Sequence, residues 1–533
     1  MVVIEISKSD LLELVGRPLS DEEIIENLFL LKMEAEIKED AIMCELSPDR
    51  PDMLSVEGIA RELKGFLGIE TGMKKYEVKK SGLTLKKENP RVRPYIACAI
   101  IKDVILSDAL VRSLMQVQEK LHATIGRDRK KVAIGVHDFD KVVNPLLYTD
   151  VEDETFVPLN MSEKMTVKEI LKKHPKGPAY AHLVKDLYPM LYDKEGVLSF
   201  PPIINSERTK VTENTKSLFI DVTGTDEKAV NLVLNILVCN ITERCGKIFD
   251  VKISNSATPK LESKEMSISV NEINDLLGIG LDEKQIAKIL ERMRYSVKKQ
   301  KGGNIVIDIP PYRSDILHKV DIIEDVAIGF GYNNIEPILP KISTIGEESE
   351  LEKLTSKIRE LMIGLGFQET LNFILTSKEN NFEKMNLDGE AVEILNPTTS
   401  EYSITRTWLL PNMLRIFFLN KNREYPQKIF EVGDCLLLDD SEKSNRQERK
   451  LVGAITYDSA NLTEIKSIVE AVLKSLGYEY EIQEYSHPSF IESRYGIILV
   501  DGKEIGMFGE ISPKVLENWK IEKPVIAFEI SVG

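Results

Sequence analysis

The sequence is poor in cysteine and tryptophan and has no long hydrophobic run. Five cysteines are scattered through 533 residues without a CxxC pair, which argues against a disulfide framework and against zinc sites. No apolar stretch approaches the ~18 residues of a membrane span, and the N-terminus lacks the basic lead and cleavable apolar core of a secretion signal. We therefore expect a cytoplasmic protein with buried thiols and no membrane contact.

The chain is also short of positive charge. Its formal net charge of −16 repels a polyanion taken as a whole, so any contact with nucleic acid requires a local basic patch or a partner chain. One basic cluster, Arg127 to Lys131, fits either a phosphate contact or a charged turn before a strand. The length and the 42 % hydrophobic content predict several cores and about three or four domains.

The chain contains the same module twice. Residues 6–28 align without a gap on residues 268–290, with matching Ile, Ser, acidic, apolar, Leu and Gly positions. The match resumes downstream, where residues 47–69 parallel residues 310–332. A match at two separated places indicates a duplicated structural unit.

Each copy of the module carries an arginine and an aspartate at corresponding positions. Arg50 and Asp52 match Arg313 and Asp315, which indicates a cap and an ion pair that belong to the shared fold. Beyond this pair, the register between the copies is uncertain by one residue. In either register, the full set of carboxylates described next occurs only in the second copy.

A helix with a marked start is predicted in the second copy. Pro310 and Pro311 forbid an earlier entry, Ser314 or Asp315 is expected to cap the free amides, and Gly331 ends the helix. The helix region carries four carboxylates, three of them at i, i+3 and i+4 on one face. They are Asp315, Asp321, Glu324 and Asp325.

Two interpretations of these carboxylates remain open. If the cluster lies at a buried interface, a hard cation such as Mg²⁺ relieves the repulsion between them. The plainer interpretation is a solvated acidic face near a helix N-terminus, where negative charge is favourable. The restriction of the full set to one copy keeps metal binding as a hypothesis.

Two stretches in the middle of the chain combine strands with small polar groups. Ser199 to Ser206 places two prolines before an apolar strand that ends in small polar residues. Asp221, Thr223 and Thr225 lie on one side of a predicted strand beside Gly224, where a ligand can approach the backbone closely. The same residue types are also ordinary at strand ends and turns.

These features divide the chain into four regions. Residues 1–75 form the first copy of the module, and residues 90–255 mix strands with helices after a lysine-rich strand pair or linker. Residues 257–337 form the second copy. Residues 345–533 open with an amphipathic helix and alternate strands with helices, which predicts an antiparallel-sheet α+β domain.

Eight motifs, in order along the whole chain, resemble the beta subunit of phenylalanyl-tRNA synthetase in its archaeal and eukaryotic form. They are RPDMLSVEGIARELKGFLG, RDRKKVAIGVHDFDK, FPPIINSE, FIDVTGTD, DIPPYRSDILHKVDIIEDVAIGFGY, NPTTSEYSITRTWLLPNML, IFEVGD and GEISPKVLENWKIEKPVIAFEI. The resemblance implies a multidomain α+β chain. It has two winged-helix-like α/β modules flanking an editing domain, followed by a class II synthetase-like domain.

The resemblance also implies an assembly. The chain is expected to join an alpha subunit in an α2β2 ligase that attaches phenylalanine to tRNA(Phe), with ATP and phenylalanine bound by the alpha subunit. The last domain lacks the expected arginine before IFEVGD, where Gln427 and Lys428 stand, and it lacks a glycine-rich, arginine-ending third motif. Without these cations the ATP phosphates have no clamp, so we expect a non-catalytic dimerisation platform.

Two sites follow from the resemblance. The family carries Mg²⁺ near the subunit boundary, which implies a structural ion at Asp315, Asp321, Glu324 and Asp325. The middle region resembles a domain that hydrolyses tyrosine wrongly attached to the tRNA, through a positioned water because no Ser-His-Asp arrangement is evident. Its expected pocket residues are Ser199, Asn205, Asp221, Thr223 and Thr225.

Two other classes of function compete with this hypothesis. A non-enzymatic scaffold would use the repeated modules to bind nucleic acid or protein, which the acidic charge disfavours. A stand-alone metal-dependent hydrolase would use the carboxylates between residues 315 and 325 with His318, the one candidate for a second catalytic group there.

Overall fold

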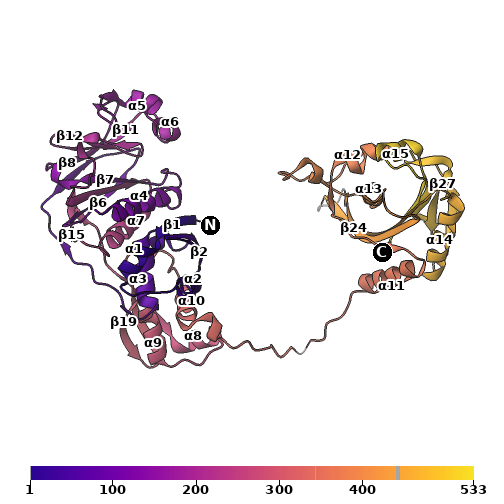
Figure 1. The fold of residues 1–533 in the computed structure, drawn as a ribbon, viewed down its shortest axis with the longest axis horizontal. Coiled ribbons are helices and arrows are strands. Elements are labelled where there is room, and N and C mark those ends of the chain that lie inside the picture. The colour runs from indigo at the N-terminus through magenta and orange to yellow at the C-terminus, as the bar shows by residue number, and fades with distance from the viewer. Residues whose placement is uncertain (1, 343, 440–443, 533) are drawn as a thin grey trace. The chain divides into compact units, whose positions relative to one another are not determined.

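The chain divides into two units, and each contains several hydrophobic cores. The computed structural model describes residues 2–342, 344–439 and 444–532, and the units are Met1–Leu339 and Pro340–Gly533 (Figure 1). No helix in the described part of the chain is long and apolar enough to cross a membrane. Four of the five cysteines are buried, as expected.

The predicted duplication is present in the fold of the first unit. Each module has the element order β-α-α-β-β-α and a three-stranded antiparallel sheet whose first and second strands flank the third, β1-β3-β2 and β18-β20-β19. The first module comprises β1 (Val2–Ser7), α1 (Lys8–Val15), α2 (Asp21–Leu30), β2 (Met33–Lys38), β3 (Ala41–Leu46) and α3 (Val56–Phe66). The second comprises β18 (Lys264–Ser269), α8 (Val270–Leu277), α9 (Glu283–Arg292), β19 (Ser296–Lys301), β20 (Asn304–Ile309) and α10 (Lys319–Phe330).

The last helix of each module resolves the uncertain register. The N-cap residues are Ser55 for α3 and His318 for α10, so the two copies align here without a gap. The expected cap at Ser314 or Asp315 was wrong, because α10 begins at Lys319. Asp315 is not available as a cap, since its two carboxylate oxygens accept from the Arg313 guanidinium at 2.8 and 2.6 Å.

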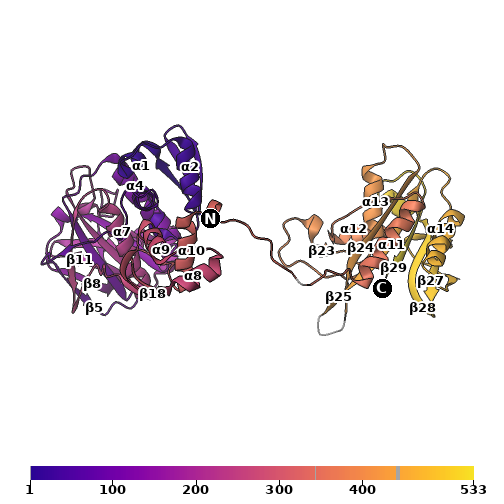
Figure 2. The same cartoon turned by 90° about the horizontal axis from the view of Figure 1, so that it is seen from below.

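The two modules contact each other through equivalent positions. After the second helix of each module comes a cation in the left-handed conformation, Lys32 (φ 66°) and Arg294 (φ 67°). Lys32 pairs with Glu324 of α10 at 3.2 Å, and Arg294 pairs with Glu70, just after α3, at 3.0 Å. Each module therefore extends a cation to the last helix region of the other, and Figures 1 and 2 show the elements of both modules within the first unit.

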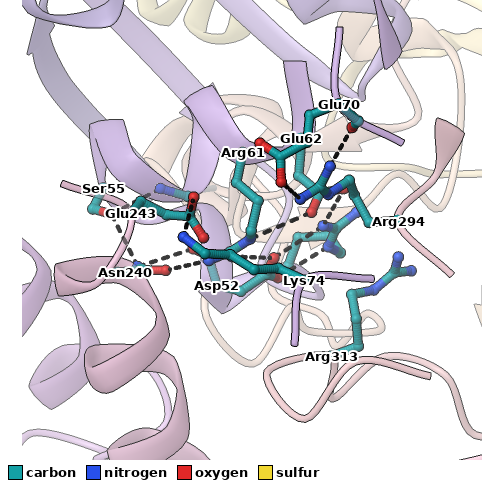
Figure 3. A network of polar contacts seen from close by, with 12 residues as sticks. Asp52, Ser55, Arg61, Glu62, Glu70, Lys74, Asn240, Glu243, Arg294 and Arg313 are labelled. Carbon is teal, nitrogen blue, oxygen red and sulfur yellow. Dashed lines mark hydrogen bonds and ion pairs between the residues drawn. The ribbon is translucent and has the colours of Figure 1, made fainter. Parts of the chain in front are cut away.

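A buried polar network joins both modules to the middle region (Figure 3). Arg61 of α3 is fully buried and donates to Asp52 at 3.3 Å and to Asn240 at 2.9 Å. Its guanidinium also lies 3.7 Å from the centre of the Tyr312 ring of the second module. Through these contacts Arg61 links the first module to the second module and to the middle region.

The middle region contains two stacked sheets with helices on both outer sides. The five-stranded sheet has the order β4-β15-β6-β14-β7, and the seven-stranded sheet has the order β13-β12-β11-β8-β5-β16-β17. The elements are β4 (Val78–Lys79), β5 (Thr84–Glu88), β6 (Tyr95–Lys102), α4 (Asp108–Ala123), β7 (Val132–Asp138), β8 (Leu146–Val151), β9 (Thr155–Phe156), β10 (Met165–Thr166), α5 (Val167–Lys173), α6 (Gly177–Tyr180), β11 (Tyr188–Asp193), β12 (Gly196–Phe200), β13 (Ile204–Asn205), β14 (Ser217–Gly224), α7 (Glu227–Ile241), β15 (Lys247–Phe249), β16 (Val251–Ile253) and β17 (Ser256–Thr258). The lysine-rich stretch before residue 90 supplies β4 and β5 to these sheets.

Alternation along β14 decides which side chains face each layer. Leu218, Ile220 and Val222 pack in the core that contains α4 and α7, whereas Phe219 packs in the core between the two sheets. Because successive side chains of a strand point to opposite faces, Asp221 and Thr223 share the face of Phe219. The polar residues of this strand therefore point toward the second sheet.

The second unit is a seven-stranded sheet covered by helices on both faces. Its strand order is β21-β24-β25-β29-β28-β27-β26, antiparallel except for the β21-β24 pair. One core includes residues of α13 and α15 and the other includes residues of α11 and α14. The elements are α11 (Glu350–Gly364), β21 (Gln368–Glu369), β22 (Leu375–Thr376), α12 (Lys378–Asn381), β23 (Ile404–Thr405), α13 (Leu410–Leu419), β24 (Gln427–Leu438), β25 (Asn445–Thr456), α14 (Leu462–Ser475), β26 (Glu481–Glu484), β27 (Phe490–Val500), β28 (Lys503–Ile511), α15 (Pro513–Asn518) and β29 (Val525–Ser531).

Candidate functional site

A pocket of about 940 Å³ opens where the edges of the two stacked sheets meet, beside β7, β13 and α4. Four of the five residues expected in a ligand site line it, namely Ser199, Asn205, Asp221 and Thr223. Thr225 does not, because β14 ends at Gly224 and Thr225 is exposed, with its backbone N–H bonded to the Lys131 carbonyl at 3.0 Å.

Asp221 is buried at the centre of the pocket wall. It is 1 % exposed and lies opposite Gly135 in the β14-β7 pair. A Cβ at Gly135 would lie 2.2 Å from Asp221 Oδ1, which is closer than side-chain carbon atoms approach oxygen. The glycine therefore makes room for the carboxylate.

Asp221 is bonded to a histidine that the sequence hypothesis did not include. Its Oδ1 lies 2.8 Å from His137 Nε2, and His137 Nδ1 lies 2.8 Å from Thr209 Oγ1. The three residues are separated by 84 and 72 positions along the chain, so the sequence showed no Ser-His-Asp-like arrangement. The β14-β7 register brings His137 and Asp221 together. It pairs Phe219 with His137 and Asp221 with Gly135, so the two side chains are diagonal neighbours on one face of the sheet.

Ser199 and Asn205 approach the pocket from the other sheet. They lie directly opposite each other in the β12-β13 pair. Asn205 Nδ2 donates to the Val136 carbonyl at 3.3 Å, which joins the edges of the two sheets. Ser199 is 2 % exposed, and its hydroxyl has no hydrogen-bond partner within the part of the chain that the structure describes. A buried polar group without a partner is costly, so Ser199 is available for a ligand.

Two buried arginines hold the pocket walls, and one of them, Arg129, itself lines the pocket. Arg93 Nε donates to Thr223 Oγ1 at 3.3 Å, and Nη2 donates to the Thr223 carbonyl at 2.8 Å. Burial lowers the pKa of Arg93 to about 10. Arg129 Nη1 donates to the carbonyls of Pro202 and Ile203 at 3.2 and 3.1 Å, which fixes the segment that follows Ser199.

The predicted basic cluster is a charged turn with one buried member. Arg127, Asp128 and Arg129 have φ values of 47°, 52° and 65°, and such left-handed conformations are unfavourable for residues with a side chain. Glu119 of α4 accepts from Arg129 at 3.1 Å and from Lys176 at 3.2 Å. The His122 imidazole, with Nδ1 3.8 Å from Glu119 Oε2, and these cations lower the pKa of Glu119 to about 2, against the opposing effect of burial.

The four carboxylates of the second module each contact the protein itself. Asp325 accepts from Arg313 at 2.7 Å and from the Tyr295 hydroxyl at 2.5 Å. Asp321 accepts from the backbone N–H groups of Leu317 and His318 at 2.7 Å each. Glu324 pairs with Lys32, and Asp315 pairs with Arg313, as described above.

The first module repeats part of this arrangement. Arg50 pairs with Asp52 at 2.9 Å and with Glu62 at 3.1 Å, just as Arg313 pairs with Asp315 and Asp325. In the ungapped register Glu62 is the counterpart of Asp325. Two of the four carboxylates thus belong to an ion-pair cluster that both copies share.

As placed, the four carboxylates do not fit a single Mg²⁺ ion. Among the described residues, no group of three or more His, Cys, Asp or Glu is arranged to hold a metal. Arg313 occupies the space between Asp315 and Asp325, while Asp321 is directed at backbone amides. The magnesium site therefore stays a prediction, and no chemistry is derived from it.

Comparison with known families places the pocket in a defined context. Three family profiles match, described as the phenylalanyl tRNA synthetase beta chain CLM domain over residues 335–532, the tRNA synthetase B5 domain over residues 266–332 and the B3/4 domain over residues 110–236. The phenylalanine–tRNA ligase beta subunit of Methanocaldococcus jannaschii is 45 % identical, with all of both chains aligned.

The chain belongs to the family of phenylalanine–tRNA ligase beta subunits. The member from Archaeoglobus fulgidus is 44 % identical over 100 % of the chain and 98 % of that protein. A crystal structure of an N-terminal fragment of the beta subunit from Pyrococcus horikoshii superposes with a TM-score of 0.60 at 41 % identity, covering 62 % of the chain and 100 % of the fragment. The suspected family is confirmed.

Within this beta-subunit fold, the B3/4 match contains the pocket's central residues. Ser199, Asn205 and the His137–Asp221 pair all lie between residues 110 and 236. The B5 match covers the second module, including α8, α9 and α10. The CLM match spans the second unit.

Proposed function

We propose that the chain serves a phenylalanine–tRNA ligase in two ways: it supports the alpha subunit in an α2β2 assembly, and it removes tyrosine wrongly attached to tRNA(Phe). The alpha subunit would bind ATP and phenylalanine and join the amino acid to the tRNA. The second activity is assigned to the pocket between the two sheets of the middle region.

The observation that carries the editing proposal is the convergence of hydrogen-bonding groups on one pocket. Asp221 and Thr223 come from one sheet and Ser199 from the other. Among the described residues the Ser199 hydroxyl has no hydrogen-bond partner. A binding site shaped for phenylalanine discriminates poorly against a ring that merely adds a hydroxyl. A second pocket that requires this hydroxyl supplies the missing discrimination, because its polar groups are satisfied only by tyrosine.

The expected reaction is hydrolysis of the ester between tyrosine and the terminal ribose. The pocket residues would hold the aminoacyl group while a water molecule attacks the carbonyl carbon. The ribose oxygen leaves with a proton, and free tyrosine and intact tRNA result. Positioning of the two reactants accounts for much of the acceleration in such a site.

The test uses the purified complex of the chain with its alpha subunit and tyrosyl-tRNA(Phe). Asp221→Ala and Thr223→Val should each slow deacylation by about 10- to 100-fold, the size expected when a buried hydrogen bond to the substrate is lost. Phenylalanylation should be unchanged, because it is assigned to the alpha subunit. Thr225→Val is the matched control, since this residue lies on the same chain segment but outside the pocket. Unchanged deacylation in Asp221→Ala and Thr223→Val would remove the pocket from the proposal.

The second unit is proposed to act as a platform without adenylate chemistry. At the start of β24, Lys428 pairs with Glu464 at 3.1 Å and Gln427 Nε2 donates to the Asn420 carbonyl at 2.9 Å. Nearby, Arg406 is 2 % exposed and pairs with Glu431 at 2.7 Å. These side chains are committed to the protein, so they are unavailable to hold nucleotide phosphates.

The magnesium proposal takes a restricted form. Asp315, Asp321 and Glu324 line a surface depression of about 530 Å³ together with Asp49. Mg²⁺ commonly keeps several of its waters, and only a hydrated ion suits carboxylates that already have protein partners. Its role would be to support subunit assembly.

A further inference from the structure

The chain of Thr209, His137 and Asp221 has a histidine at its centre that does not itself line the pocket. His137 is completely buried, whereas its two partners both line the cavity. We propose that His137 is a positioning residue that fixes the Asp221 carboxylate and, with Thr209, sets the hydrogen-bond polarity of the pocket wall. This inference rests on the editing function proposed above.

The donor and acceptor roles in the Thr209–His137–Asp221 chain follow from which atoms carry protons. An ionised carboxylate can only accept hydrogen bonds, so the contact of 2.8 Å between Asp221 Oδ1 and His137 Nε2 requires the proton to lie on Nε2. In the neutral imidazole this leaves Nδ1 as an acceptor. The hydroxyl of Thr209, 2.8 Å away, then donates its hydrogen to Nδ1.

This arrangement determines what each pocket residue can offer a ligand. Among the described residues the second oxygen of Asp221 has no hydrogen-bond donor, so it can accept from a ligand. The Thr209 hydroxyl already donates its hydrogen to His137, so toward a ligand it too can only accept. Thr223 is the opposite case, because its oxygen accepts from Arg93 Nε and its own hydrogen is free to donate. The wall therefore presents acceptors at Asp221 and Thr209 and a donor at Thr223.

A phenolic hydroxyl matches this pattern. It is both a donor and an acceptor, so it can donate to Asp221 while it accepts from Thr223, two residues along the same strand and on the same face. A phenylalanine ring offers neither interaction and would leave both groups unpaired in a buried place. The polarity set by His137 and Thr209 therefore suits the tyrosine side chain already proposed as the ligand of this pocket.

The surroundings hold the imidazole in this position. His137 packs beside Phe219 with ring centres 5.8 Å apart. A Cβ at Gly135 would lie 3.0 Å from His137 Nε2 as well as 2.2 Å from Asp221 Oδ1. The glycine, the phenylalanine and the two hydrogen bonds together leave the ring one orientation.

The experiment separates the two nitrogen atoms of His137 with amide substitutes. In the purified complex, His137→Gln places a donor near the position of Nε2 and retains the Asp221 contact. His137→Asn reaches only the position of Nδ1 and loses that contact. Deacylation of tyrosyl-tRNA(Phe) should fall at least tenfold further in His137→Asn than in His137→Gln, the size expected for losing a hydrogen bond to a charged group.

Thr209 is tested by removing and restoring its hydroxyl. Thr209→Val should slow deacylation about tenfold, and Thr209→Ser should restore it to within about threefold of the unmodified complex. Thr258→Val is the control, because Thr258 is also buried and bonded, to Cys98, but lies outside the pocket. This control should leave deacylation per folded complex unchanged.

The outcomes are distinguishable. Equal loss in His137→Gln and His137→Asn would overturn the positioning role, and it would favour Thr209 as a nucleophile that needs Nδ1 as its base. Failure of Thr209→Ser to restore the rate would also overturn the inference. If Asp221→Ala slows deacylation but all His137 and Thr209 variants behave as the unmodified complex, the inference fails while the editing function stands. If the unmodified complex does not deacylate tyrosyl-tRNA(Phe), both fail.

Discussion

At the scale of single residues, the first unit depends on buried charges that have specific partners. Asp52 is 0 % exposed and contacts Arg50 and Arg61 at 2.9 and 3.3 Å. Burial by itself raises the pKa of an aspartate, but the two arginines outweigh it here and lower the pKa of Asp52 to about 2. The carboxylate is therefore more easily ionised in the folded chain than in the unfolded one.

A pH dependence of stability follows from this shift. Because the folded-state pKa lies below the ordinary value of 3.8, the stabilisation is complete above about pH 4 and is lost as the pH falls toward 2. The linked free energy is about 2 kcal/mol. The destabilisation caused by Asp52→Asn should therefore be largest near pH 6 and shrink below about pH 4, measured by urea unfolding of the full chain. A cost that stays the same at every pH would contradict this account.

The sequence predicted those pocket residues whose position depends on a local pattern, such as strand alternation or the composition of a short stretch. Asp221 and Thr223 followed from strand alternation, and Ser199 from the composition of its stretch. Thr225 lies outside the pocket, because the strand ends at Gly224 and alternation along the sequence does not reveal where a strand ends. His137, Thr209 and Arg93 were missed, since their role depends on which strands pair and in which register, and a single sequence does not show this.

At the scale of elements, the first module is held together by close backbone approach as well as by ion pairs. Gly58 lies in the first turn of α3, and a Cβ there would be 1.9 Å from the Asp52 carbonyl oxygen. The atoms that this Cβ would meet, in Asp52 and Met53, all belong to the backbone, so they cannot move aside. The glycine allows α3 to pack on the segment that carries the Arg50–Asp52 pair.

Gly58→Ala should therefore destabilise the chain, although alanine is the better helix former. The clash should outweigh the helical gain and cost about 2 kcal/mol in the free energy of unfolding. Gly280→Ala is the matched control in the same unit, because no atom lies within 4 Å of a Cβ at that position, and it should change stability by less than about 0.5 kcal/mol. Thermal unfolding of the full chain measures both, and equal melting temperatures for the two variants would refute the packing argument.

The elements themselves were largely predictable, and the exceptions have a physical cause. The repeat and the long helices followed from hydrophobic spacing and capping residues. The start of α10 did not, because Arg313 holds Asp315 and leaves the cap to His318. The grouping of both modules with the middle region into one unit depends on contacts between distant segments, such as Arg61 with Asn240.

At the scale of the whole molecule, internal ion pairs should stabilise the folded first unit without a bound metal. Chelation of divalent cations should leave the melting temperature of the isolated chain unchanged, since Arg313 and Lys32 already neutralise the acidic helix. Asp325→Asn should cost about 3 kcal/mol by breaking a buried pair, with or without Mg²⁺. A Mg²⁺-dependent rise in melting temperature that Asp321→Asn abolishes would instead place the ion on the carboxylates of the depression.

The central claim is that this chain provides the α2β2 ligase with a second site, which hydrolyses tyrosyl-tRNA(Phe). The most direct measurement follows tyrosyl-tRNA(Phe) in the complete complex supplied with ATP, tRNA(Phe) and excess tyrosine. The account predicts that tyrosyl-tRNA(Phe) accumulates with Asp221→Ala and stays near background with the unmodified chain, while both attach phenylalanine at the same rate. Equal amounts of tyrosyl-tRNA(Phe) from the two complexes would contradict it.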